Sequence, residues 1–235
     1  MHKCIDITFG LLALIYPITR HSIDCNLLNA LLKCVPIFFL ITFLYLAKDS
    51  VHSHVNQYRK NVLYGMVFCM FGDVFIAYTH VWTDALLIGI LAFGVGHMFY
   101  ITAFGFQPFK ISGLATVVAL ELVSLVVLRE PLTEMGAIYM GTIPVYMLLL
   151  LGMAWRATAE GNTNCYRKIG GYSFIVSDLL LALTEVTGII GPKLCSPQMS
   201  TILVLSTYYF AQYGIAKSAL EQGGMCPMAK KGKNK

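Results

Sequence analysis

Charged residues are scarce in this sequence: Asp, Glu, Lys and Arg make up 12% of its 235 residues. A soluble globular domain carries about 25% charged residues, so the composition excludes a water-soluble globule. Hydrophobic residues reach 57%. They occur in blocks of about twenty residues, each long enough to cross a bilayer core of about 30 Å. The composition therefore predicts an integral membrane protein without a separate soluble domain.

Signatures of several kinds of site are also missing. The seven cysteines form no Cys-x-x-Cys pair and show no zinc-ligand spacing, and neither Gly-x-Ser-x-Gly nor His-Glu-x-x-His occurs. The net charge is +5, but four of the seventeen basic residues lie in the last six positions. No basic stripe with interleaved aromatics is present elsewhere. We therefore expect no metal, no cofactor and no nucleic-acid partner.

The apolar blocks predict eight transmembrane spans. In lipid these should be α-helices, because an open strand edge would leave its amides unpaired. The spans are Ile5–Thr19, Leu27–Ala47, Val62–His80, Thr83–Ala103, Ile111–Leu128, Met135–Trp155, Tyr166–Val186 and Met199–Leu220. The connections are short, so neighbouring spans should pack antiparallel. The expected fold is an all-α polytopic bundle formed by residues 1–222, followed by a basic tail at 223–235.

The distribution of Lys and Arg predicts the orientation. With the N-terminus in the cytoplasm, thirteen of these residues fall on the cytoplasmic side and three (Arg20, Arg129 and Lys193) on the other. By the positive-inside rule both termini then face the cytoplasm. The tail carries Lys231 and Lys233, the fifth and third residues from the end. This pattern fits a dilysine retrieval signal and predicts the endoplasmic-reticulum membrane. The alternative is a polybasic segment attracted to anionic lipid.

Six ionisable side chains inside the spans are candidates for functional groups, because an Asp or Lys at the centre of a membrane helix costs roughly 2.5–3.5 kcal/mol and requires a partner or a wet cavity. They are Lys33, Asp73, His97, Glu121, Asp178 and Glu185. At 1.5 Å per residue, Asp73 lies roughly 20 Å beyond Lys60 and Asp178 roughly 15 Å beyond Lys168. Both carboxyls should therefore lie near mid-membrane. Lys33, on an inward-running span, should lie close to the level of Asp73.

Further polar side chains should meet these groups in one central chamber. Tyr208 and Gln212 are four residues apart near the middle of the last span, and His97 and Tyr100 share one helix face nearer the cytoplasmic mouth. His97 is equally well interpreted as a core histidine with satisfied hydrogen bonds and no function. Glu121 has no second polar group on its face, so we expect it to be structural or at the lipid edge.

Two carboxylates in one low-dielectric cavity cannot both ionise easily, so Asp73 and Asp178 should hold a proton between them. The pair would supply one general acid and one carboxylate, which suits reactions that pass through a cation. The alternative is a purely structural arrangement in which both neutralise Lys33 in the core.

Several motifs resemble the lysoplasmalogenase (YhhN-type) family of eight-helix membrane proteins. In order, they are Lys33-Cys34-Val35-Pro36, Phe71-Gly72-Asp73, Gly96-His97-Met98-Phe99-Tyr100, Phe174-Ile175-Val176-Ser177-Asp178 and Leu205-Ser206-Thr207-Tyr208-Tyr209-Phe210-Ala211-Gln212. The resemblance implies hydrolysis of the vinyl ether bond of lysoplasmalogens, with Asp73 and Asp178 as the catalytic pair. The substrate-binding residues would then be Lys33, His97, Tyr100, Ser206, Tyr208, Tyr209 and Gln212. No metal or nucleotide is needed, and the alkenyl chain should lie in an apolar groove between helices.

Two other functional classes stay open. Midplane carboxylates and a histidine also suit a proton-coupled transporter, although no inverted repeat is visible. A non-catalytic lipid-binding regulator would share the same fold. The expected partners are a lysophospholipid substrate and the bilayer, and the sequence leaves open a homodimer and a disulfide between Cys25 and Cys195 on the outer side.

Overall fold

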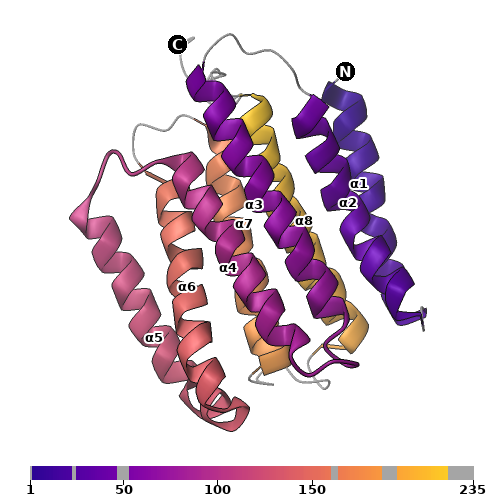
Figure 1. Ribbon diagram of the computed structural model, residues 1–235, viewed down its shortest axis with the longest axis vertical. Helices are drawn as coiled ribbons and strands as arrows, with labels where there is room; N and C mark the ends of the chain where they lie inside the picture. Colours follow the sequence, from indigo (N-terminus) through magenta and orange to yellow (C-terminus); the bar gives the residue numbers. More distant parts are fainter. Residues whose placement is uncertain (1, 23–24, 47–52, 160–163, 187–194, 222–235) are drawn as a thin grey trace.

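The computed structural model describes residues 2–22, 25–46, 53–159, 164–186 and 195–221. These residues form a helical bundle in which consecutive α-helices run in opposite directions (Figure 1). The α-helices are α1 (His2–Thr19), α2 (Asn26–Leu46), α3 (Ser53–Ala77), α4 (Ala85–Phe104), α5 (Ile111–Met135), α6 (Ala137–Ala157), α7 (Cys165–Leu181) and α8 (Pro197–Leu220). A 3-10 turn, η1 (Arg20–Ser22), follows α1, and a π turn, η2 (Ala182–Val186), follows α7. Within the described ranges there is no strand, so the predicted all-α fold is confirmed.

Each predicted span coincides with one helix, and the two largest differences lie at helix ends. Helix α3 begins at Ser53 rather than near Val62, and α5 continues through Pro131 to Met135 rather than ending near Leu128. Hydropathy detects the apolar part of a helix, whereas a helix also continues through polar residues beyond the bilayer core. The ends of apolar blocks are therefore poor guides to the ends of helices.

In the part of the chain that the structure describes, five helices are long and apolar enough to cross a membrane: α2, the part of α3 from Gln57 to Ala77, α4, α5 and α6. Large apolar side chains also face outward along the bundle, for example Phe38, Leu91, Val126 and Phe210. Such a surface is unsuited to water and suited to lipid tails. The protein is therefore an integral membrane protein.

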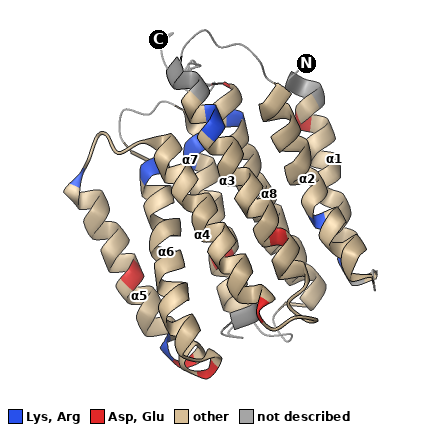
Figure 2. Ribbon diagram, viewed as in Figure 1, with Lys and Arg blue, Asp and Glu red and all other residues tan. Residues whose placement is uncertain are grey.

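The first and last helices meet at one end of the bundle. Nζ of Lys217, in the last turn of α8, lies 2.8 Å from Oδ2 of Asp6, near the start of α1. Lys and Arg gather at this end (Figure 2). The start of α1 and the end of α8 thus lie on the same side, as the sequence predicts for an even number of spans. The tail carrying Lys231 and Lys233 lies outside the described residues.

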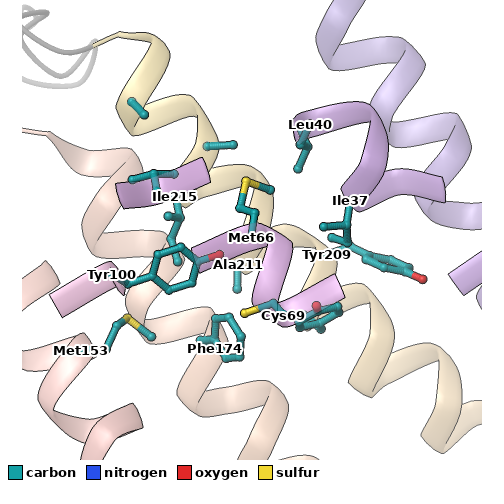
Figure 3. Close-up of a cluster of buried hydrophobic side chains, with 14 of the residues drawn as sticks. Ile37, Leu40, Met66, Cys69, Tyr100, Met153, Phe174, Tyr209, Ala211 and Ile215 are labelled. Carbon is teal, nitrogen blue, oxygen red and sulfur yellow. The ribbon is translucent and has the colours of Figure 1, made fainter. Parts of the chain in front are cut away.

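Helix α3 occupies the centre of the bundle and packs against α2, α4 and α8. Figure 3 shows the buried core, to which α3 contributes Met66 and Cys69 beside Tyr100 of α4 and Phe174 of α7. Close contact depends on glycine: a Cβ at Gly96 would lie 3.0 Å from the carbonyl oxygen of Gly65. Small residues at such crossings are the usual way for membrane helices to approach each other. Tyr100 occupies the space that Gly65 leaves open, so this crossing also positions a polar group.

The suggested disulfide between Cys25 and Cys195 is wrong, because both thiols are free in the structure. Cys25 precedes α2 and Cys195 precedes α8, and their sequence positions place them on one side of the membrane without bringing them into contact. A shared membrane side is a far weaker constraint than the roughly 6 Å Cα separation that a disulfide requires.

Candidate active site

The centre of the bundle holds an ion pair between Lys33 of α2 and Asp73 of α3. Nζ of Lys33 lies 3.1 Å from Oδ1 of Asp73, and the two side chains are 9% and 1% exposed. The sequence predicts this encounter, since both residues fall at a similar depth on neighbouring helices. A buried carboxylate beside a buried ammonium is stabilised in its charged form, because each ion replaces the solvation that the other has lost.

Helix α8 completes the surroundings of Asp73. The hydroxyl of Tyr208 donates a hydrogen bond of 2.6 Å to Oδ2 of Asp73. Gln212, one turn further along, donates from Nε2 to the Tyr208 oxygen at 3.3 Å and accepts a 2.6 Å hydrogen bond from the Tyr100 hydroxyl. All four side chains are buried. Asp73 thus accepts hydrogen bonds from one cation and one hydroxyl. We call Asp73, Lys33, Tyr208, Gln212 and Tyr100 the Asp73 cluster.

Tyr209 joins α8 to the same region through the backbone. Its hydroxyl donates a 2.9 Å hydrogen bond to the carbonyl oxygen of Lys33. The hydroxyl is therefore engaged with α2 beside the ion pair. Tyr209 and its neighbour Tyr208 consequently have different tasks: Tyr208 contacts the carboxylate, and Tyr209 holds the helix that carries the ammonium.

Asp178 lies in a second group of polar residues. Oδ2 of Asp178, on α7, accepts a hydrogen bond from the hydroxyl of Tyr146 on α6. The Tyr146 hydroxyl also lies 3.4 Å from Nε2 of His97 on α4. The α-helical hydrogen bonding of α7 gives way to the π turn η2 four residues after Asp178, and π turns are frequent near functional sites. We call Asp178, Tyr146 and His97 the Asp178 cluster.

The two carboxyls do not share a hydrogen bond or an ion pair in the part of the chain that the structure describes. That the pair holds one proton therefore stays a prediction, and the two carboxyls do not hold it in a hydrogen bond to each other. The ring of Phe174 lies between the clusters. It packs edge-on against His97 and Tyr208, with ring centroids 4.8 Å and 5.5 Å apart. Cys69 of α3, a buried residue, lies near both Asp73 and Asp178. The sequence predicts one central chamber, whereas the structure has two adjoining clusters of packed side chains.

Tyr146 is the site residue that the sequence analysis does not identify. It lies two residues after Pro144 in the mostly apolar α6, and a tyrosine there is normally interpreted as packing. The only signal is its hydroxyl at mid-span, since a polar atom in a membrane helix needs a partner. Hydropathy alone does not tell which partner that is.

Other candidate residues lie away from both clusters. Ser206 is exposed on α8, and Glu121 is half-buried on α5, which packs against α6 at one edge of the bundle (Figure 1). The side chain of Glu185 lies outside the described part of the structure. Asp6, near the start of α1, pairs with Lys217 and accepts a 2.6 Å hydrogen bond from Tyr213. This group ties α1 to α8.

No group of three or more His, Cys, Asp or Glu residues within the described ranges is arranged to hold a metal ion. What the site offers chemically is two carboxyls in contrasting surroundings, three tyrosine hydroxyls, an ammonium, an amide and an imidazole. The carboxyls come from different helices, α3 and α7, and both lie near Cys69.

The YhhN family matches residues 28–219, which include every residue of both clusters. The chain belongs to the YhhN family. It is 34% identical to the human protein named lysoplasmalogenase TMEM86A over 204 residues, which are 82% of this chain and 78% of that protein. It is 30% identical to the mouse protein named lysoplasmalogenase TMEM86B over 200 residues, 84% of this chain and 77% of that protein. No solved structure matches this YhhN-family chain.

Proposed function

We propose that this YhhN-family protein is a lysoplasmalogenase, which hydrolyses the vinyl ether bond of lysoplasmalogens to a fatty aldehyde and a glycerophospho-headgroup. Two lines of support converge. The relatives that cover most of the chain are named for this activity. The observation that carries the proposal is the placement of Asp73 and Asp178 in two different polar clusters inside an apolar bundle.

The chemistry of a vinyl ether requires such groups. The rate-limiting event is proton transfer to the β-carbon, which converts the double bond into an oxocarbenium ion. Water then adds to the carbon next to the ether oxygen, and the resulting hemiacetal collapses to an aldehyde and an alcohol. One carboxyl supplies the proton, and the other stabilises the cation and accepts a proton from water. Glycosidases divide these tasks between two carboxyls in the same way.

The polar groups around the carboxyls would bind the glycerophospho-headgroup or orient the carboxyls. Lys33, with its ammonium, suits a phosphate, and the hydroxyls of Tyr100 and Tyr208 and the amide of Gln212 suit the glycerol hydroxyl. His97 supports the Asp178 cluster. We omit Ser206 from the site because its side chain is exposed, and we omit Tyr209 because its hydroxyl is engaged by the Lys33 carbonyl.

An apolar groove beside α3 and α4 suits the alkenyl chain. It is lined by Phe68, Phe71, Phe75, Ile88, Leu91, Ala92 and Val95 and has a volume of about 290 Å³. The groove flanks the segment of α3 that carries Asp73. It lies on the outward, lipid-facing side, so a chain can enter it sideways from the bilayer. We further propose that Lys231 and Lys233 retain the protein in the endoplasmic reticulum.

Turnover by the purified protein tests the proposal. In detergent or liposomes it should release a fatty aldehyde from a lysoplasmalogen without any ion gradient. The matched control is the lysophospholipid with a saturated ether at the same position, which cannot be protonated at carbon and should stay intact. Absence of aldehyde, or equal cleavage of both lipids, would contradict the proposed function. Binding without turnover would favour a lipid-binding regulator, and gradient-dependent flux would favour a transporter.

A further inference from the structure

The two clusters give the carboxyls unequal surroundings. Asp73 faces the Lys33 ammonium at 3.1 Å and accepts from Tyr208. Asp178 accepts from the Tyr146 hydroxyl, and no cation within the described residues lies in ion-pair range of it. A carboxyl without a cation inside an apolar bundle is far more stable in its neutral, protonated form. A carboxyl beside an ammonium is stable as the anion.

The Tyr146 hydroxyl has one proton, and its direction fixes the rest of the Asp178 cluster. That proton points to Oδ2 of Asp178, so the Tyr146 oxygen must accept from Nε2 of His97. His97 is then neutral with its proton on Nε2, and Nδ1 is an unprotonated nitrogen without a hydrogen-bond partner in the described residues. The chain of donors runs His97 to Tyr146 to Asp178. Each bond in such a chain strengthens the next.

We propose that Tyr146 is a positioning residue that holds Asp178 as the proton donor, while Lys33 and Tyr208 hold Asp73 as the carboxylate. This assignment rests on the proposed vinyl ether hydrolysis. Because Tyr146 occupies Oδ2 of Asp178, the transferable proton is on Oδ1. Tyr146 touches the acid, not the substrate, so it acts through Asp178.

The proton balance closes over one turnover. The O–H bond at Asp178 breaks, and the π electrons of the vinyl ether form a C–H bond at the β-carbon, which leaves Asp178 anionic. Water adds to the oxocarbenium carbon and gives one proton to Asp73. Asp73 then protonates the departing glycerol oxygen, and the hemiacetal hydroxyl returns a proton to Asp178 as the aldehyde forms. Both carboxyls end as they began.

The groups that face each carboxyl determine its pH dependence. Facing Asp178 are Tyr146 of α6, His97 of α4 and, at longer range, Cys69 of α3. Facing Asp73 are groups from five helices, namely Tyr16 of α1, Lys33 and Cys34 of α2, Cys69 of α3, Tyr100 of α4 and Tyr208 and Tyr209 of α8. Lys33 is the one permanent cation in these two sets. Activity should therefore fall at low pH when Asp73 takes up a proton and at high pH when Asp178 loses its own.

Two tyrosine-to-phenylalanine variants separate the assignments through the pH profile of kcat. A carboxylate that loses a hydrogen-bond donor holds a proton more tightly. Tyr146→Phe should therefore move the high-pH limb to higher pH, leave the low-pH limb in place and lower kcat by about tenfold. Tyr208→Phe should move the low-pH limb to higher pH and leave the high-pH limb in place. Tyr172→Phe, which removes a hydroxyl exposed on α7, should move neither limb.

The outcomes distinguish this inference from the proposed function. If Tyr146→Phe moves the low-pH limb, or both variants move the same limb, the assignment of roles is overturned while the hydrolase proposal stands. A wild-type protein that releases no aldehyde overturns both. If Tyr146→Phe does not fold, His97→Leu replaces it. This change weakens Tyr146 as a donor and should move the high-pH limb in the same direction by a smaller amount, and an unchanged limb overturns the inference.

Discussion

The Lys33 ammonium and the Asp73 carboxylate form a buried ion pair of 3.1 Å that joins α2 to α3 at the centre of the bundle. Both ions depend on it, because each is almost fully removed from solvent and has few other polar neighbours. The pair therefore has two roles that experiments can separate. It stabilises the bundle, and in the proposed mechanism it keeps Asp73 ionised.

Removal of the cation should affect both roles. Lys33→Met leaves a buried carboxylate unpaired, which should lower the free energy of unfolding by about 3 kcal/mol and abolish aldehyde release. Thermal unfolding in detergent and an aldehyde assay measure the two effects. In the double variant Lys33→Met with Asp73→Leu, stability should recover while activity stays absent. A Lys33→Met variant with wild-type activity would show that Asp73 needs no cation.

Amide substitutions test the two carboxyls directly. Asp73→Asn and Asp178→Asn each preserve side-chain volume and remove an ionisable group. Each should lower kcat by about 100-fold or more, because a general acid or base is lost. Expression and elution as a single species from size-exclusion chromatography serve as the folding control. Glu121→Gln, a matched change in α5 outside both clusters, should leave turnover unchanged. Substantial turnover by either well-folded aspartate variant would remove that residue from the mechanism.

The neighbouring tyrosines of α8 should respond differently to loss of the hydroxyl. Tyr208→Phe removes a hydrogen bond to the reacting carboxylate, so it should lower kcat. Tyr209→Phe removes a hydrogen bond to the Lys33 carbonyl, so it should lower the free energy of unfolding by about 1 kcal/mol and leave kcat near the wild-type value. Measuring kcat and thermal stability for both variants checks the contrast. Equal effects on kcat would contradict the separate roles of these residues.

The groove between α3 and α4 predicts that a bulky side chain in its wall weakens binding of the alkenyl chain. Ala92→Trp should fill it, raise KM for substrates with long alkenyl chains and affect short-chain substrates much less. Ala119→Trp, on the exposed surface of α5, is the matched control and should change neither. A uniform loss of activity at all chain lengths would indicate distortion of the bundle instead of occlusion of a chain site.

Much of this architecture is predictable from sequence because depth in a membrane follows from counting residues. The eight helices coincide with eight apolar blocks, and the rise per residue places Lys33 level with Asp73. Counting gives height but not the direction in which a side chain points around its helix. For that reason Asp178 was expected beside Asp73, whereas it accepts from Tyr146 on the other side of Phe174.

The remaining differences have the same origin. Ser206 lies between buried Leu205 and half-buried Thr207, yet it faces outward. Tyr146 and His97 come from α6 and α4, two helices that pack against each other without being neighbours in the sequence. Asp6 and Lys217 are neighbours because the bundle brings its first and last helices together, which no local pattern reveals.

Proton transfer to carbon is the central event of the proposed reaction, and it leaves a solvent-derived hydrogen on a carbon atom of the aldehyde. When wild-type protein cleaves lysoplasmalogen in deuterium oxide, mass spectrometry should find a single deuterium on carbon 2 of the fatty aldehyde. The deuterium-labelled aldehyde should disappear in Asp178→Asn. An aldehyde formed without deuterium at carbon 2, or formed at an undiminished rate by Asp178→Asn, would contradict carbon protonation by this carboxyl.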